Sequence, residues 1–134
     1  MSTLWTDGNG YFYSGDMRPG DRAATDAEVA AWEAAHRAMP ASVQIVSAGT
    51  PAVSGFYTTS PPQIDLFAAQ EISILATGKF TNGVTTLLWL DNGVTFPDTA
   101  SFVAVAKAYA AYVTAATLAL ADGSALPTQP VNIP

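Results

Sequence analysis

The chain has 134 residues, enough for one ordinary domain with a small appended module and too few for two large cores. Only 12% of its residues are charged, about half the usual share for a soluble domain, while 49% are apolar, so we expect partners, or a coat of Ser, Thr, Ala and Gly, to cover much of its surface. The net charge of −6 and the scattered positions of its Lys and Arg residues argue against a nucleic-acid binder, which needs clustered cations to neutralise phosphates.

The first predicted element is a two-stranded arm within residues 4–17. Aromatic residues flank the sequence Asp7-Gly8-Asn9-Gly10, and Asp-Gly and Asn-Gly tolerate the positive φ of a hairpin turn. An isolated hairpin is marginal in water, so these aromatic side chains should pack on the next helix or on a neighbouring protein. We therefore expect a docking surface that contains Trp5, Tyr11 and Tyr13.

A helix follows the arm, because Thr25 and Glu28 have the spacing of a capping box. Pro40 ends this helix after about 13 residues. Residues 41–60 contain no Lys, Arg, Asp or Glu, and they predict short strands at 43–46 and 55–58. The connector at 48–51 lies between these strands, and we place the module boundary there.

A second helix begins after Ser60, because proline is favoured in the first helical turn and Ser60 with Gln63 again has capping-box spacing. Gly78 suits the left-handed position that follows a helix. Two residues, Leu66 and Ile74, fall off the main apolar face. That face is predicted to contain Ile64, Phe67, Ala68, Ile72 and Leu75.

A β-hairpin is predicted between the second and third helices. Residues 85–90 are rich in β-branched and aromatic side chains, Asp91-Asn92-Gly93 is a turn sequence, and residues 94–96 begin the returning strand. After the third helix, the prolines at 127, 130 and 134 forbid regular helix and predict an extended tail. We expect this tail to be disordered or to lie along a partner.

The third helix, residues 98–122, carries one charged side chain, Lys107, between its two ends, although a lone surface helix needs a broad polar face. One side can fill a small core, with Phe102, Val105, Ala106, Tyr109, Tyr112, Val113, Ala116 and Leu120 at helical spacing. The opposite side is small and weakly polar. We predict that a second helix or another subunit covers this side, which includes Val103, Ala110, Thr114 and Leu118.

Together these elements predict an α+β protein made of three parts. A small N-terminal β-hairpin plus helix occupies residues 1–48. A helix–β-hairpin–long helix domain occupies residues 49–123, and the extended Pro-rich C-terminal tail occupies residues 124–134.

No group of residues indicates catalysis, a cofactor or a metal, and the absence of cysteine excludes thiolate sites. His36 is the sole histidine, so a histidine triad would lack its partners, and a role at a helix end explains the residue. Turn chemistry explains Asp7, Asn9 and Asp16 better than calcium binding, because they lack the spacing of an EF-hand loop. We therefore predict no enzymatic activity, no catalytic residue and no cofactor.

The sequence contains residues that suit two further types of site, glycoside cleavage and sugar stacking. The acid pairs Glu28/Glu33 and Asp65/Glu71 could serve glycoside cleavage, but their spacing on helices does not align the two carboxylates. Five aromatic residues could stack on sugars, although aromatics at alternating strand positions more often form packing surfaces. They are Trp5, Tyr11, Tyr13, Tyr57 and Trp89.

The glycine, aromatic and apolar positions between residues 55 and 113 include Gly55-Phe56-Tyr57, Gly78-Lys79-Phe80, Gly83-Val84-Thr85-Thr86-Leu87-Leu88-Trp89, Asp91-Asn92-Gly93 and Tyr112-Val113. This pattern resembles an uncharacterised helix–hairpin–helix domain of bacteriophage and prophage tail-fibre and tail-fibre-assembly proteins. The leader Gly10-Tyr11-Phe12-Tyr13-Ser14, followed by an acidic helix, is similar to the short leader of tail-fibre-assembly proteins. A histidine that often precedes the second-strand aromatic in that domain is missing from Gly93-Val94-Thr95-Phe96, so no role of that histidine is carried over.

The resemblance implies a phage-tail setting and no known reaction. With the apolar third helix, it predicts a non-enzymatic structural component of a tail or tail fibre, which binds other tail or fibre proteins or forms a homo-oligomer such as a trimer. Two alternatives are a tail-fibre assembly chaperone, which leaves after assembly, and a host-receptor or glycan-binding tail tip. We expect synthesis in the host cytoplasm and a final place in the virion tail, because residues 1–16 lack the features of an export signal and no membrane span of about 18 uninterrupted apolar residues occurs.

Overall fold

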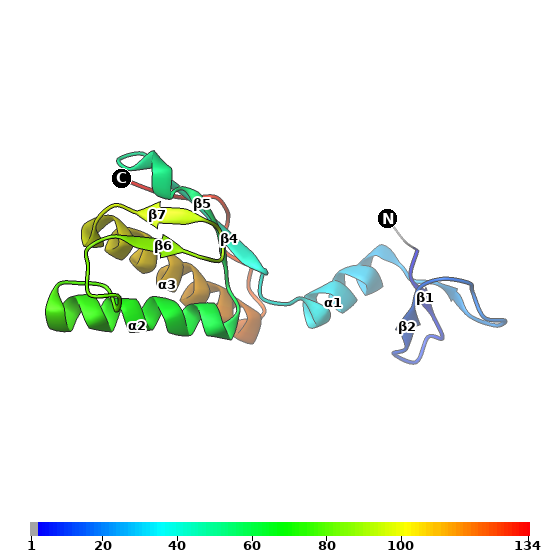
Figure 1. Cartoon of the computed structure of the whole chain (residues 1–134). Helices are drawn as coiled ribbons and strands as arrows, with labels where there is room; N and C mark the ends of the chain where they lie inside the picture. Colours follow the sequence, from blue (N-terminus) through cyan, green and yellow to red (C-terminus); the bar gives the residue numbers. More distant parts are fainter. Residues whose placement is uncertain (1–2) are drawn as a thin grey trace. The chain divides into compact units, whose positions relative to one another are not determined.

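The computed structural model describes residues 3–134 and shows two compact units (Figure 1). Met1 and Ser2, the first residues of the segment considered for an export signal and of the predicted N-terminal module, lie outside the described residues. The first unit ends at Ala38, and the second runs from Met39 to Pro134. The mixed α+β class is confirmed.

The first unit consists of a small antiparallel sheet and one helix. Its strands are β1 (Trp5–Thr6), β2 (Phe12–Tyr13) and β3 (Arg22–Ala23), in the order β2-β1-β3. The predicted hairpin is therefore present as β1 and β2. Strand β3 was not predicted, because the Arg18-Pro19-Gly20 sequence breaks the strand pattern just before it.

Helix α1 (Asp26–His36) begins with the predicted capping box. The Thr25 hydroxyl accepts from the Glu28 backbone amide at 3.2 Å, and the Glu28 carboxylate accepts from the Thr25 amide at 2.9 Å. Arg22 also donates to the Glu28 carboxylate, at 2.6 Å. This hydrogen bond from Arg22, together with that from the Thr25 amide, lowers the pKa of Glu28 to about 2.

The second unit contains two sheets. Strands β4 (Ser42–Ser47), β5 (Gly55–Thr58) and β8 (Val131–Ile133) form a sheet in the order β5-β4-β8, in which β4 is antiparallel to β5 and parallel to β8. A short 3-10 turn, η1 (Pro51–Val53), connects β4 and β5. Strands β6 (Leu87–Trp89) and β7 (Val94–Phe96) form the predicted hairpin.

This sheet corrects two predictions. Because β4 pairs with β5, the chain on both sides of residues 48–51 belongs to one sheet, and the boundary between the units lies earlier than predicted. The tail at 124–134 is part of the second unit, because β8 adds to β4. The Gln129 side chain fixes the tail by accepting from the Gln44 amide at 2.8 Å and donating to the Tyr112 hydroxyl at 2.9 Å.

Helices α2 (Pro61–Thr77) and α3 (Thr99–Asp122) begin and end close to the predicted residues. The Asp98 carboxylate caps α3 by accepting from the Ser101 amide at 2.7 Å, and each helix is followed by a glycine at positive φ, Gly78 or Gly123. The predicted capping box of α2 is absent. The Ser60 side chain makes no capping hydrogen bond, and its backbone carbonyl accepts from the amides of Gln63 and Ile64.

The core of the second unit is a cluster of aromatic rings around Phe67 of α2. Its ring centroid lies 4.1 Å from that of Tyr109, 4.3 Å from Trp89 and 5.6 Å from Phe102. The predicted inner stripe of α3 is buried at Phe102, Val105, Ala106, Tyr109, Tyr112 and Ala116, and half-buried at Val113 and Leu120. Helix α3 contacts α2 and strands β4, β7 and β8, so one core joins both sheets to both helices.

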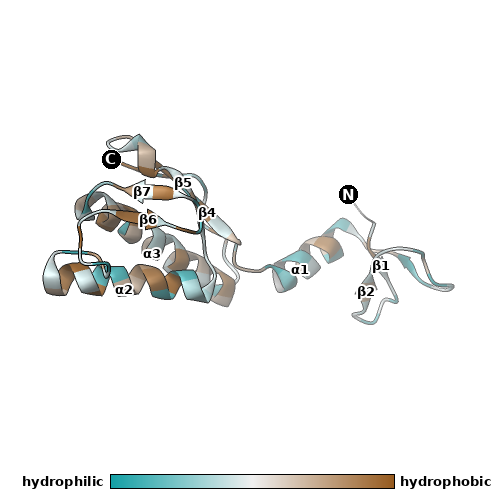
Figure 2. Cartoon of the chain, viewed as in Figure 1, coloured by the Kyte–Doolittle hydropathy of each residue, from teal (hydrophilic) through white to brown (hydrophobic). Residues whose placement is uncertain are grey.

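The predicted inner face of α2 is partly wrong. Phe67 is buried and Ile64 packs against the core, but Ile72 and Leu75 are 67% and 90% exposed. Ala68 is also exposed, whereas Ile74, predicted to lie off this face, packs against the core. The reason is Gln70, which is buried because its side-chain amide binds Thr81 through two hydrogen bonds of 2.9 Å. With Gln70 facing inward, Ile72 and Leu75 face outward. Figure 2 shows that hydrophobic and hydrophilic segments alternate along α2.

Phe67 and Leu75 offer a matched test of this arrangement, since both are large apolar residues of α2. We expect Phe67→Ala to lower the free energy of unfolding of the second unit by about 3–5 kcal/mol, because it empties the centre of the aromatic cluster. Leu75→Ala should change it by less than about 0.5 kcal/mol in dilute solution. Urea unfolding measures both values, and equal losses in the two variants would contradict the described face of α2.

The contacts of Glu28 make the stability of the first unit depend on pH. The pKa of Glu28 is about 2 in the folded unit against an ordinary value of 4.5, so its contacts stabilise the unit above pH 4.5 and this contribution is lost as the pH falls towards 2. We expect Glu28→Gln to remove this acid-dependent step, and Glu33→Gln, on the same helix, to retain it. Amide NMR shifts of α1 report the step, and a Glu28 carboxylate that titrates near pH 4.5 would show that the ion pair is absent.

Candidate interaction surfaces

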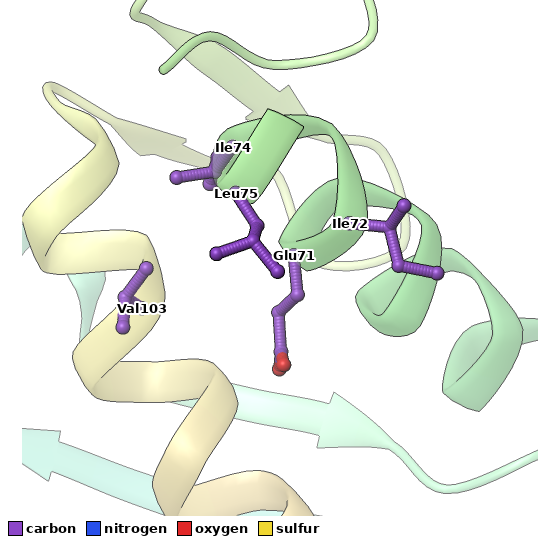
Figure 3. A pocket seen from close by; sticks show the side chains of 5 residues that line it. All are labelled: Glu71, Ile72, Ile74, Leu75 and Val103. Atoms are coloured by element: carbon purple, nitrogen blue, oxygen red, sulfur yellow. The ribbon is translucent and has the colours of Figure 1, made fainter. Parts of the chain in front are cut away.

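The outer side of the α2–α3 pair carries a groove. One hollow of about 330 Å³ is lined by Glu71, Ile72, Ile74, Leu75 and Val103. A second, of about 210 Å³, is lined by Ile64, Phe67, Ala68, Glu71, Ala106, Tyr109, Ala110, Val113 and Thr114. Glu71 lines both hollows, so they are neighbouring parts of what we call the α2–α3 groove. Figure 3 shows the first hollow, with Glu71 and Leu75 from α2 near Val103 from α3.

Three of the four predicted interface residues of α3 line this groove, and Leu118 lies beyond it. Val103 is half-buried and lines the first hollow, while Ala110 and Thr114 are exposed and line the second. Leu118 lies one helical turn beyond Thr114 and is 61% exposed. The α3 residues are mostly small, whereas the large exposed side chains of the groove, Ile72 and Leu75, come from α2.

The large residues on α2 could not be recognised as surface residues from the sequence, because they share the helix with Phe67 and appear equally suited to a core. One feature of the sequence does indicate exposed apolar residues: α2 carries more large apolar side chains than one core-facing stripe can hold. Polar Gln70, at the buried position, gives no such signal without its partner Thr81.

Two charged groups lie on the outer side of the α2–α3 pair. Glu71 is on α2, and Lys107 lies on α3 between Val103 and Ala110. Both side chains are exposed, and neither makes an ion pair or a hydrogen bond within residues 3–134. Glu71 thus lines the groove, and Lys107 lies beside it on the exposed side of α3, within one helical turn of the lining residues Val103 and Ala110.

The predicted docking residues of the first unit form contacts within that unit. The rings of Tyr11 and Tyr13 stack with centroids 5.6 Å apart, and the Arg18 guanidinium carbon lies 4.8 Å and 4.5 Å from those centroids. The Tyr13 hydroxyl donates to Asp21 at 2.7 Å, and the Trp5 indole donates to the Gly15 carbonyl at 2.8 Å. Tyr11 remains 51% exposed, so it is the most accessible ring of this surface.

Two aromatic residues considered for sugar stacking are core residues. Tyr57 is fully buried and Trp89 is 4% exposed, which confirms the packing interpretation for both. Burial raises the pKa of Tyr57 to about 12. Neither ring is available to a glycan, so a sugar-stacking face would have to rely on the first unit.

The remaining candidate residues have structural contacts. His36 ends α1, where its ring stacks on Trp32 at 4.4 Å and its Nδ1 lies 2.9 Å from the Trp32 carbonyl oxygen. The Asp7 carboxylate accepts from the Asn9 amide at 2.7 Å, as expected for a turn. Among the residues that the structure describes, no three His, Cys, Asp or Glu side chains are grouped as metal ligands.

Helix α3 is long and apolar enough to cross a membrane by length and composition alone, although Lys107 interrupts its apolar sequence. Its contacts favour a helix of a protein core. The Tyr109 hydroxyl donates to the Thr58 carbonyl oxygen at 2.8 Å, and Lys107 lies near the middle of the helix, where a charge costs about 3 kcal/mol in a bilayer.

No protein-family model, no curated protein and no solved structure matches this chain. The resemblance to a phage-tail domain therefore stays an expectation. The groove between α2 and α3, with its exposed aliphatic side chains and two unpaired charges, is the feature of the molecule that best supports a function.

Proposed function

We propose that this protein is a non-enzymatic structural component of a bacteriophage tail or tail fibre, and that it acts by assembly through the α2–α3 groove. The observation that supports this proposal is the exposure of three large aliphatic side chains on α2 and α3. Ile72, Leu75 and Leu118 are 67%, 90% and 61% exposed. Monomeric proteins rarely expose large continuous apolar patches, and such patches mark interaction sites.

The energy available from this surface is sufficient for assembly. Complete burial of one Leu or Ile side chain contributes roughly 1.5–3 kcal/mol, so three such side chains contribute several kcal/mol before the cost of association. Few charges oppose burial, because Glu71 alone is charged among the residues that line the two hollows. A partner that offers apolar groups and matching charges would therefore bind here.

The phage-tail setting comes from the resemblance of residues 55–113 to a tail-fibre-associated domain. A small helical domain with one apolar outer side and a separate N-terminal unit suits a part that is held between other tail or fibre proteins. In this proposal the first unit supplies a second attachment, through the exposed Tyr11 ring.

The same exposed groove also supports the alternative of a tail-fibre assembly chaperone, which would cover a folding fibre and then leave. The stoichiometry in purified particles separates these two functions. A structural component is present in a fixed ratio to the other tail proteins, whereas a chaperone is present during assembly and absent from the finished particle.

The role of the groove is tested by replacing its aliphatic side chains. We expect Ile72→Ser with Leu75→Ser to lower incorporation into particles by roughly a hundredfold, because about 3 kcal/mol of apolar burial is lost. Quantitative mass spectrometry of purified particles measures incorporation. Leu90→Ser is the matched control, since Leu90 is 87% exposed in the turn of the hairpin, away from the groove.

The control variant should be incorporated as well as the natural chain. Normal incorporation of the double variant, with the chain present in the natural ratio, would rule out the groove as the assembly surface.

A further inference from the structure

The two helices of the groove run in opposite directions. Residues Ile72 and Leu75, near the end of α2, share a hollow with Val103, near the start of α3. Ile64, in the first turn of α2, shares the other hollow with residues further along α3, including Thr114. Glu71 lines both hollows, so it lies level with the middle of the stretch 103–114, where Lys107 is located. The acid thus lies at the centre of the groove on α2, and the base lies level with it on the exposed side of α3.

This arrangement is self-complementary under one particular two-fold rotation. If the axis runs along the helices, α2 of each copy lies over α3 of the other, and each Glu71 faces a Lys107. If the axis runs across the helices in the same plane, α2 lies over α2, and Glu71 faces Glu71. Opposite charges attract and like charges repel when they face each other across an interface, so the charges favour the first arrangement.

The sizes of the side chains select the same arrangement. The large exposed residues of the groove, Ile72 and Leu75, are on α2, whereas α3 offers the small residues Ala110 and Thr114. Placing α2 on α3 of the second copy sets large side chains against small ones, which allows close packing. Placing α2 on α2 would set Leu75 among other large side chains and leave the small residues of α3 poorly covered.

The surface is large enough for a weak specific dimer. The two helices have 17 and 24 residues, so they share a face about 25 Å long and about 20 Å wide. Two copies would bury about 1,000 Å² in total, which is the lower limit for a specific interface. The single copy already carries both charges of the pair, so no further partner is needed to neutralise the groove.

We propose that the occupant of the α2–α3 groove is the same groove of a second copy of this chain, in a two-fold dimer in which Glu71 of each copy pairs with Lys107 of the other. This inference rests on the proposed assembly function and names its partner. In this proposal the dimer, and not the single chain, is incorporated into the tail or fibre.

Sedimentation equilibrium of the full chain, from dilute to several hundred micromolar, tests the dimer. We expect the natural chain to dimerise, and Glu71→Lys or Lys107→Glu to weaken dimerisation by about tenfold, because each change creates two like-charge contacts. The chain that carries both changes should dimerise like the natural chain, since the swapped charges pair again. The controls Glu33→Lys, on α1 of the first unit, and Lys79→Glu, after the end of α2, make the same charge changes at exposed positions that the proposed dimer does not pair.

Circular dichroism confirms that every variant is folded. The proposed dimer is overturned if the natural chain stays monomeric over the whole concentration range. It is also overturned if the variant with both charge changes dimerises as weakly as the single variants. A monomer that cosediments with phosphatidylcholine vesicles would also overturn it and would identify lipid as the occupant.

The two proposals fail in different ways. If the chain is monomeric but the variant with Ile72→Ser and Leu75→Ser is lost from particles, the groove binds a different protein and the assembly function stands. If that variant is incorporated normally, the assembly function itself is wrong, whatever the sedimentation result.

Discussion

The second unit depends on one aromatic cluster that is shared by two helices and two small sheets. Phe67 of α2 contacts Trp89, Phe102 and Tyr109, and these rings join α2 to the hairpin and to α3. Gln70 fixes the rotation of α2 by binding Thr81, because a buried amide must satisfy its hydrogen bonds. The sides of α2 and α3 that remain exposed are those that this cluster does not occupy.

A single core covers only one side of each helix. In most surface helices the other side is charged, but α2 and α3 place Ile72, Leu75 and Leu118 there. Large apolar side chains are also exposed elsewhere in the unit, as at Leu90, but Ile72 and Leu75 line a groove between two helices. In the proposed dimer, Glu71 and Lys107 provide orientation, while the aliphatic side chains provide the energy of association.

The features that could be predicted from the sequence are those set by local backbone chemistry or by one strong periodicity. The Thr25–Glu28 box, the glycines after α2 and α3, and the inner stripe of α3 belong to this class. Strand β8 could not be predicted, because its partner β4 is remote in sequence and its prolines suggest an open tail. The α3 side of the groove could be predicted, because α3 lacks charged side chains there. The α2 side was predicted to be core, because the hydrogen bonds between Gln70 and Thr81 that orient α2 are tertiary contacts.

The central claim is that the α2–α3 groove is covered when the protein is assembled. Hydroxyl-radical footprinting with mass spectrometry, applied to the dilute chain and to assemblies recovered from the cells that make it, tests this claim most directly. We expect Ile72 and Leu75 to be oxidised in the dilute chain and protected in the assembly, with Leu90 oxidised equally in both. Equal oxidation of Leu75 in both states would contradict the claim.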